Sequence, residues 1–289
     1  MRSDVSDDEP MTPDLASAAY ERIGVTRDIS SPEALRRAEP LLIQRAGVYE
    51  RMGSKMWELA WADSIETGHT LPAIGEIDHA EPAFVDYVES VLSPSDRPIT
   101  CLVPGCGKGL AVAHLAQSLP NSMSVGLDIA PAAVATARDF LQRQLGGKSN
   151  SKSRRWAMEV GDFFDWHAPF SFDMIYDATF LCSLPPTRRS DWARRMAELL
   201  ARDGELVTLI FPCGEYQGGP PFAMDPQLVR TLLEHNGFRC VSMEEVPRNK
   251  RSRPGFRGCT EWFARWRLDA AEPAADFSPE DDAADISMF

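Results

Sequence analysis

The chain has 289 residues, enough to bury a complete α/β core as one domain with extensions. Its formal net charge is −13, and much of the acidic excess lies at the two ends. Residues 1–9 carry four acids and one base, and residues 269–289 carry seven acids and no base. An acidic chain of this kind is a poor binder of nucleic acid, so we expect no nucleic-acid partner.

The composition also predicts how the chain is organised. Residues 1–12 and 269–289 are too polar and acidic to offset the entropy of ordering, so both are predicted to be disordered tails. Between them we expect a helical extension over 13–95 and an α/β domain over 96–268. No segment is apolar for the roughly eighteen residues of a membrane span, and the acidic N-terminus does not resemble a signal peptide.

The six cysteines form no C-x-x-C pair and stand at no zinc-ligand spacing with histidine. We therefore predict no metal site and reduced thiols in a cytoplasmic enzyme.

Apolar strands alternate with amphipathic helices from Thr100 onward. The first strand starts at Thr100, a second ends at Asp128, and a hairpin is expected at the end of the chain because two strands follow there without a helix between them. This order predicts a doubly wound, Rossmann-like sheet of seven strands, mostly parallel with a C-terminal antiparallel hairpin strand. Further strands are expected over 155–160, 172–177, 205–211, 238–246 and 260–268, and helices over 108–119, 130–145, 186–200 and 226–236.

A glycine turn after the first strand is the strongest local signal. It contains Gly105, Gly107 and Gly109, and the second strand ends about twenty residues later in Asp128. Glycines let a ligand approach the backbone closely, and an acid at a strand tip can accept hydrogen bonds from ribose hydroxyls. The glycine spacing differs from the G-x-G-x-x-G pattern of dinucleotide-binding enzymes, which makes a dehydrogenase the weaker alternative.

Four stretches together resemble the thiopurine methyltransferase superfamily, which includes thiol and halide/thiocyanate methyltransferases. The similarity spans roughly residues 50–268. It implies a class I methyltransferase with S-adenosyl-L-methionine as cofactor and S-adenosyl-L-homocysteine as product. The four stretches are LVPGCGKG at 102–109, VGLDIAPAA at 125–133, GDFF at 161–164 and YDATFLCSLPP at 176–186.

The resemblance also implies which residues bind the cofactor. Asp128 is expected on the ribose, Asp162 and Phe163 on the adenine, and the glycine turn with Asp177 and Thr179 on the methionine part. Trp57 and Trp61, four residues apart on one helix face, are expected as an aromatic lid or as an anchor of that helix. Cys182 is interpreted as packing, and Cys106 as a small residue of the turn. The implied cofactor set is Trp57, Trp61, Gly105, Cys106, Gly107, Asp128, Ile129, Asp162, Phe163, Asp177 and Thr179.

The methyl acceptor is less well defined by the sequence. The loop over 211–224 is expected to line its pocket with Tyr216, Phe222 and Met224, and the arginine cluster over 248–257 is interpreted as a solvated loop. No catalytic base is identified, which favours a small soft nucleophile, a thiol first. The alternatives are a halide or thiocyanate acceptor, an oxygen or nitrogen acceptor, and a non-catalytic protein that binds the cofactor.

Overall fold

The computed structural model describes residues 55–67, 77–93, 97–145, 155–215, 217–253, 256 and 259–269. The predicted tail at 1–12 and, except for Asp269, the tail at 269–289 lie outside these ranges. Of the predicted helical extension, only two parts are described, and both contain helices.

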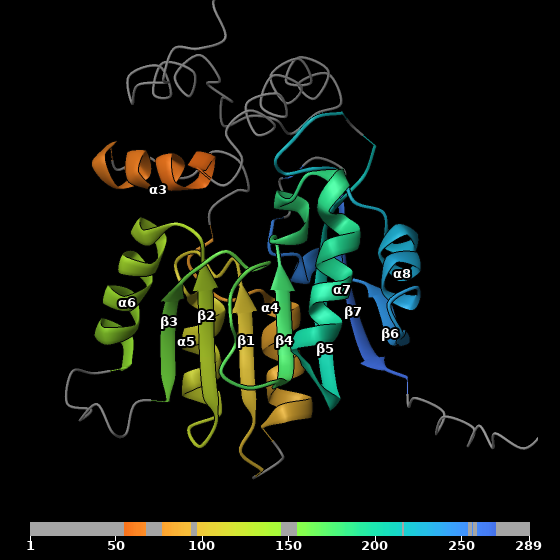
Figure 1. Ribbon diagram of the computed structural model, residues 1–289, viewed down its shortest axis with the longest axis horizontal. Helices are drawn as coiled ribbons and strands as arrows, with labels where there is room; N and C mark the ends of the chain where they lie inside the picture. Colours follow the sequence, from red (N-terminus) through yellow and green to blue (C-terminus); the bar gives the residue numbers. More distant parts are fainter. Residues whose placement is uncertain are drawn as a thin grey trace, which may run out of the picture.

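A seven-stranded sheet forms the centre of the molecule, in the order β3-β2-β1-β4-β5-β7-β6 (Figure 1). The first five strands are parallel, and β7 runs antiparallel to both β5 and β6. The predicted fold class and the closing hairpin are thereby confirmed. The strands are β1 Thr100–Pro104, β2 Met123–Asp128, β3 Trp156–Val160, β4 Phe172–Ala178, β5 Leu200–Cys213, β6 Phe238–Glu245 and β7 Thr260–Leu268.

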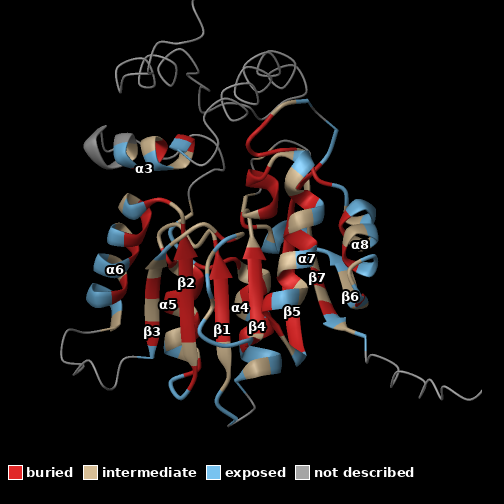
Figure 2. Cartoon of the chain, in the orientation of Figure 1, coloured by how far each residue is buried: buried red, intermediate tan, exposed pale blue. Residues whose placement is uncertain are grey.

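Helices cover both faces of the sheet. One apolar cluster joins the sheet to α4, α5 and α6, and a second cluster on the opposite face joins it to α7 and α8. The central strands are accordingly buried along most of their length (Figure 2). The helices are α3 Lys55–Thr67, α4 Pro82–Tyr87 with a π-helical turn η1 Val88–Leu92, α5 Leu110–Ser118, α6 Pro131–Leu145, α7 Arg189–Leu199 and α8 Pro226–Glu234; short 3-10 turns are η3 Leu181–Ser183, η4 Pro186–Arg188 and η5 Arg248–Lys250. None of the helices in the described part of the chain is long and apolar enough to cross a membrane.

Local sequence accounts for most of these boundaries. Pro131 and Pro226 stand in the first turns of α6 and α8, where a missing N–H costs nothing. Asp225 caps α8, accepting a 2.8 Å hydrogen bond from the backbone N–H of Gln227.

The predicted start of β5 at residue 205 was wrong, because the strand already begins at Leu200. Leu200 pairs with Phe172, and the register then shifts before Glu205 pairs with Met174. The exposed Arg202 and Asp203 and the buried Gly204 lie in this irregular stretch of β5.

The strand order reverses at β1, which lies between β2 and β4. Connections leave to opposite sides of such a point, so a crevice opens at the carboxyl ends of the strands. Helix α3 lies beyond this end of the sheet, above α6 and the tips of β3 and β2 (Figure 1). The candidate site lies here.

Candidate functional site

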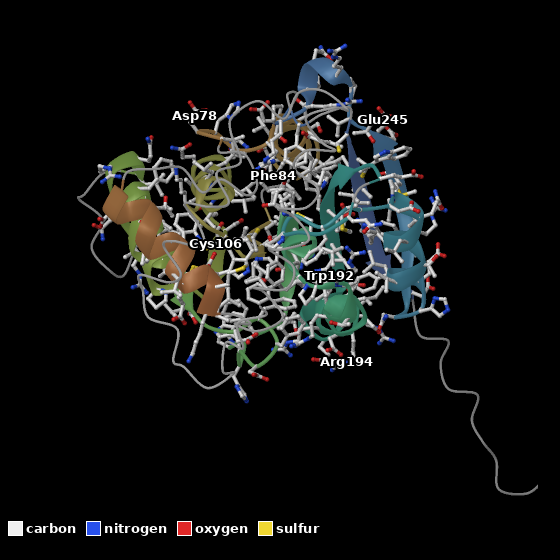
Figure 3. All side chains as sticks on the ribbon, turned by 90° about the horizontal axis from the view of Figure 1, so that it is seen from above. Asp78, Phe84, Cys106, Trp192, Arg194 and Glu245 are labelled. Carbon is white, nitrogen blue, oxygen red and sulfur yellow. The ribbon has the colours of Figure 1, made fainter. Side chains whose placement is uncertain are left out.

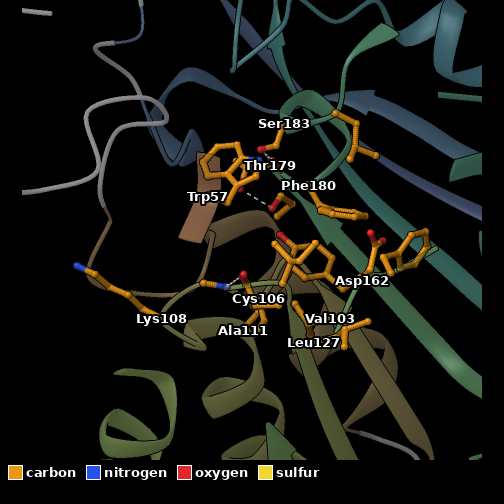
Figure 4. A pocket seen from close by; sticks show the side chains of 18 of the residues that line it. Trp57, Val103, Cys106, Lys108, Ala111, Leu127, Asp162, Thr179, Phe180 and Ser183 are labelled. Carbon is orange, nitrogen blue, oxygen red and sulfur yellow. Dashed lines mark hydrogen bonds between the residues drawn. The ribbon is translucent and has the colours of Figure 1, made fainter. Parts of the chain in front are cut away.

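A cleft of about 860 Å³ opens at the carboxyl ends of the central strands. Figure 4 shows Trp57, Thr179, Phe180 and Ser183 on one side of it, and Val103, Ala111 and Leu127 on the other. Ten of the eleven residues predicted for the cofactor line this cleft, and Asp177 is the exception: they are Trp57, Trp61, Gly105, Cys106, Gly107, Asp128, Ile129, Asp162, Phe163 and Thr179.

The glycine turn forms the floor of the cleft beside β1. Gly105 and Gly107 have φ angles of 57° and 51°, in the left-handed region that favours glycine. A Cβ atom on Gly105 would lie 2.5 Å from the ring of Phe180, and one on Gly107 would lie 3.3 Å from the ring of Trp61. Glycine at these two positions thus lets the rings of Phe180 and Trp61 lie close to the turn.

Asp128 is held in a fixed position at the tip of β2. Its Oδ2 accepts a 3.0 Å hydrogen bond from the N–H of Gly107, and its Oδ1 accepts one of 3.0 Å from the N–H of Ala130. Burial raises the pKa of this carboxyl, while the backbone donors act in the opposite direction. Each oxygen keeps acceptor capacity beyond these bonds, so the carboxylate suits a pair of ribose hydroxyls.

The segment after β3 supplies a carboxylate and a flat apolar wall. Asp162 Oδ1 accepts a 2.9 Å hydrogen bond from the N–H of Phe164, which orients the side chain at the rim. Phe163 is 4% exposed and makes edge-on contacts with Phe164 and Phe180, at ring centroid distances of 5.3 and 5.1 Å. An acceptor beside an aromatic wall fits a purine that carries an amino group.

The two tryptophans of α3 both reach the cleft. Trp61 is 7% exposed and packs with Ala130 and Ala133, while Trp57 is half-buried. Seen from above, α3 extends alongside α6, and one of its ends comes near Cys106 (Figure 3). Trp61 therefore anchors the helix, and both side chains cover the cleft, so the lid and the anchor interpretations are compatible.

The cysteines near the cleft are poor nucleophiles. Burial raises the pKa of Cys106 well above its ordinary value, and the negative charge of Asp128 adds to the shift. Burial also raises the pKa of Cys182 to about 12. Thiols of this kind stay protonated at neutral pH, which agrees with the interpretation that these two cysteines serve packing and not catalysis.

Asp177 faces away from the cleft. Its carboxylate accepts hydrogen bonds from Trp192 Nε1 at 2.8 Å and from the N–H groups of Phe180 and Leu181, both at 3.2 Å. Burial raises its pKa to about 6. The side chain ties β4 to η3 and α7, and the structure does not bring it into the cofactor set.

Thr179 occupies the turn directly after β4. Its φ angle of 66° is unusual for a β-branched residue. The carbonyl of Thr179 accepts hydrogen bonds from Ser183 Oγ at 2.6 Å and Cys182 Sγ at 3.3 Å, which hold the turn in place. Strained backbone of this kind, supported by its surroundings, is common where a chain borders a ligand.

The residues predicted for the acceptor do not line the cleft. Phe222 and Met224 are buried, and their N–H groups donate to Cys182 and Pro212 carbonyls at 2.7 and 2.9 Å. These two residues of the loop thus pack inward and do not border the cleft. Tyr216 lies outside the described residues.

The cleft is also lined by residues that were not predicted for it from the sequence. Among them are Glu81, Tyr176 and Arg253, from three separate segments of the chain. The arginine cluster was interpreted as a solvated loop, which is wrong for Arg253, because its side chain is only 8% exposed. Glu81 directly precedes Pro82, which starts α4, and nothing in its local sequence indicates a place in the cleft.

The chain is similar to known proteins over most of its length. It matches the thiopurine S-methyltransferase family over residues 53–267. It is 34% identical to thiocyanate methyltransferase 1 of Arabidopsis thaliana, covering 73% of this chain and 83% of that protein. It is 33% identical to probable thiol methyltransferase 2 of the same plant, covering 74% of this chain and 89% of that protein.

Solved structures repeat the fold at low sequence identity. A magnesium protoporphyrin IX methyltransferase from Synechocystis, with bound S-adenosylhomocysteine, has a TM-score of 0.53 at 16% identity, covering 77% of this chain and 98% of that one. Likeness at this level concerns the fold alone, whereas the family match extends over the glycine turn, Asp128 and the GDFF stretch. The chain therefore belongs to the thiopurine S-methyltransferase family and is a methyltransferase that depends on S-adenosylmethionine.

Proposed function

We propose that the protein transfers a methyl group to the sulfur of a small thiol and that the cleft under α3 is where it does so. The observation that carries this proposal is the convergence of ten predicted cofactor residues on one cleft at the switch point of the sheet. The names of the relatives, thiocyanate and thiol methyltransferases, support a small acceptor with a soft nucleophilic atom.

The residues of the cleft fit the cofactor part by part. Asp128 would accept from the ribose hydroxyls, and Asp162 with Phe163 would hold the adenine. The glycine turn and Thr179 would border the methionine part, with Trp57 and Trp61 closing over it. Bound there, the cofactor supplies a methyl group already activated by a sulfonium ion.

The protein then has two tasks, alignment and exclusion of water. A methyl transfer of this kind needs the acceptor sulfur in line with the methyl carbon and the leaving sulfur. The rigid turn at Gly105 and the ring of Phe180 beside it limit where an acceptor can sit. The tryptophans cover the cleft and lower the exposure of the reacting groups to water, and their rings attract positive charge.

The composition of the chain supports a proposal for the cellular compartment and for the class of acceptor. All six cysteines are free thiols, as expected for a reducing compartment, and we propose the cytoplasm. The acidic balance of the chain supports a small-molecule acceptor and argues against nucleic acid. We also propose that residues 1–12 and 269–289 act as solubilising tails, with the helical part of 13–95 covering the catalytic domain of 96–268.

The direct test is methyl transfer from labelled S-adenosylmethionine to a panel of acceptors. We expect methylated product with small thiols, and the panel should include thiocyanate, iodide, phenols and amines. A halide or thiocyanate acceptor is the second candidate, because a plant relative with 34% identity is named thiocyanate methyltransferase 1. Transfer to oxygen or nitrogen with none to sulfur would contradict the proposal.

A further inference from the structure

A buried charged cluster forms one wall of the cleft. Glu81 is 6% exposed, and its Oε2 accepts a 3.2 Å hydrogen bond from the hydroxyl of Tyr176. Its Oε1 lies 3.6 Å from Nη2 of Arg253. Glu81, Tyr176 and Arg253 all border the cleft and come from the start of α4, from β4 and from the segment before β7.

The side chain of Glu81 does not cap the helix that it precedes. Its backbone carbonyl accepts from the N–H groups of Phe84 and Val85 at 2.9 and 3.0 Å, but its side chain makes no capping bond. The carboxylate is instead turned toward the cleft wall. Burying a carboxylate is unfavourable even when it is paired, so its place on a ligand cleft points to a use there.

The charges in this wall balance one to one. Arg253 supplies one positive charge and Glu81 one negative charge, and Tyr176 is neutral because burial and the carboxylate raise its pKa. The ring of Phe211 lies 5.2 Å from the guanidinium carbon of Arg253 and adds no formal charge. The other charged residues that line the cleft are Lys108, Asp128, Asp162 and Arg188, so its formal charges balance overall. An acceptor beside Glu81 therefore meets a paired carboxylate and guanidinium, and not an excess of positive charge.

We propose that Glu81 is the proton acceptor for a neutral thiol, so that the enzyme favours thiols over ready-made anions. This inference rests on the proposed function. The S–H bond of the thiol breaks and its proton moves to a carboxylate oxygen of Glu81, while the sulfur keeps the electron pair. That pair forms the new bond to the methyl carbon, and the pair of the broken carbon–sulfur bond stays on the cofactor's sulfur. The proton on Glu81 then passes to water.

Charge balance explains the selectivity. When a neutral thiol gives its proton to Glu81, the negative charge moves from the carboxylate to the sulfur, and Arg253 still faces one anion. Thiocyanate or iodide brings a second negative charge beside Glu81 in a site of low dielectric. Such an anion binds well only if Glu81 first takes up a proton from the solution.

The first test compares turnover in Glu81→Gln with a matched control. Gln has the size of Glu and can accept from Tyr176, but it cannot take a proton. We expect kcat for 2-mercaptoethanol to fall by about 100-fold or more, the usual scale of lost acid–base catalysis. The ratio of thiocyanate to thiol turnover should rise by at least the same factor. Glu89→Gln, an exposed glutamate in η1, should leave both unchanged.

The second test needs no turnover. Thiocyanate is titrated into the protein saturated with S-adenosylhomocysteine, by calorimetry in phosphate and in Tris. Because these buffers differ in heat of ionisation, the comparison counts protons. The wild type should take up a proton on binding, as should Glu81→Asp, whereas Glu81→Gln should bind at least about tenfold more tightly with no uptake. Equal affinity and no uptake in the wild type would overturn the inference.

The outcomes separate this inference from the proposed function. If no thiol is methylated by the wild type, the proposed function fails. If thiols are methylated while Glu81→Gln keeps the thiol kcat and the thiocyanate affinity of the wild type, only the role of Glu81 fails. An unchanged affinity for S-adenosylhomocysteine in Glu81→Gln shows that the cofactor part of the cleft is intact.

Discussion

Two features of the structure, the backbone conformation and the lack of space for a side chain, require glycine at position 105. Its φ angle of 57° disfavours any residue with a side chain, and the ring of Phe180 occupies the space that a Cβ atom would need. Gly237, at the end of α8, shares only the first feature, since nothing lies within 4 Å of its would-be Cβ. The two glycines therefore share a left-handed backbone and differ in steric crowding, which is present at Gly105 and absent at Gly237.

Replacing each glycine by alanine should separate strain from crowding. Gly237→Ala should lower the free energy of unfolding by about 1 kcal/mol, the cost of left-handed backbone. Gly105→Ala should lower it by about 2–4 kcal/mol, because Phe180 must also move. It should further weaken binding of S-adenosylhomocysteine. Urea unfolding measures the first quantity, and equal losses in the two variants would contradict the crowding.

At the level of elements, Asp177 connects three parts of the fold. From β4 it reaches Trp192 of α7 and the two N–H groups at the start of η3. Its pKa of about 6 lies above its ordinary value of 3.8 because burial disfavours the charged form. A raised folded pKa means that this group stabilises the fold fully below the unfolded pKa and loses that contribution as pH rises through 6.

The pH dependence of stability tests this connection. Between pH 7 and pH 5 the wild type should gain about 1 kcal/mol of unfolding free energy relative to Asp177→Asn, which cannot titrate. Chemical denaturation at the two pH values gives the difference. Asp203→Asn, which removes an exposed carboxylate of β5, is the control and should track the wild type. A constant gap between wild type and Asp177→Asn would contradict the raised pKa.

The misassignment of Asp177 has a geometric cause. Side chains alternate along a strand, so Ile175 and Asp177 face α7 while Tyr176 faces α4. The sequence indicates where β4 ends but not which of its faces turns to the cleft, because both faces are buried. The motif around the glycine turn was predictable because its spacing alone defines its backbone.

Across the whole molecule, pairings between distant segments complete the cleft. Arg253 and Glu81 are separated by 172 positions in the sequence and meet only because β7 pairs with β5 and α4 packs on the same face. Glu205 of β5 reinforces that arrangement, accepting from Tyr87 at 2.8 Å and from Arg265 at 2.6 Å. The local sequence of the arginine cluster over 248–257 does not reveal the contact between Arg253 and Glu81, because a high density of charge alone favours a solvated loop.

Cofactor binding in the assembled cleft is the central claim, and titration calorimetry with S-adenosylhomocysteine tests it most directly. The wild type should bind one equivalent, and NAD should produce no heat of binding. Asp128→Asn should weaken binding about 10- to 100-fold, since it removes a charged acceptor worth about 1.5–3 kcal/mol. Asp139→Asn, on the exposed face of α6, should bind like the wild type. No binding by the wild type, or equal affinity in Asp128→Asn, would contradict the account.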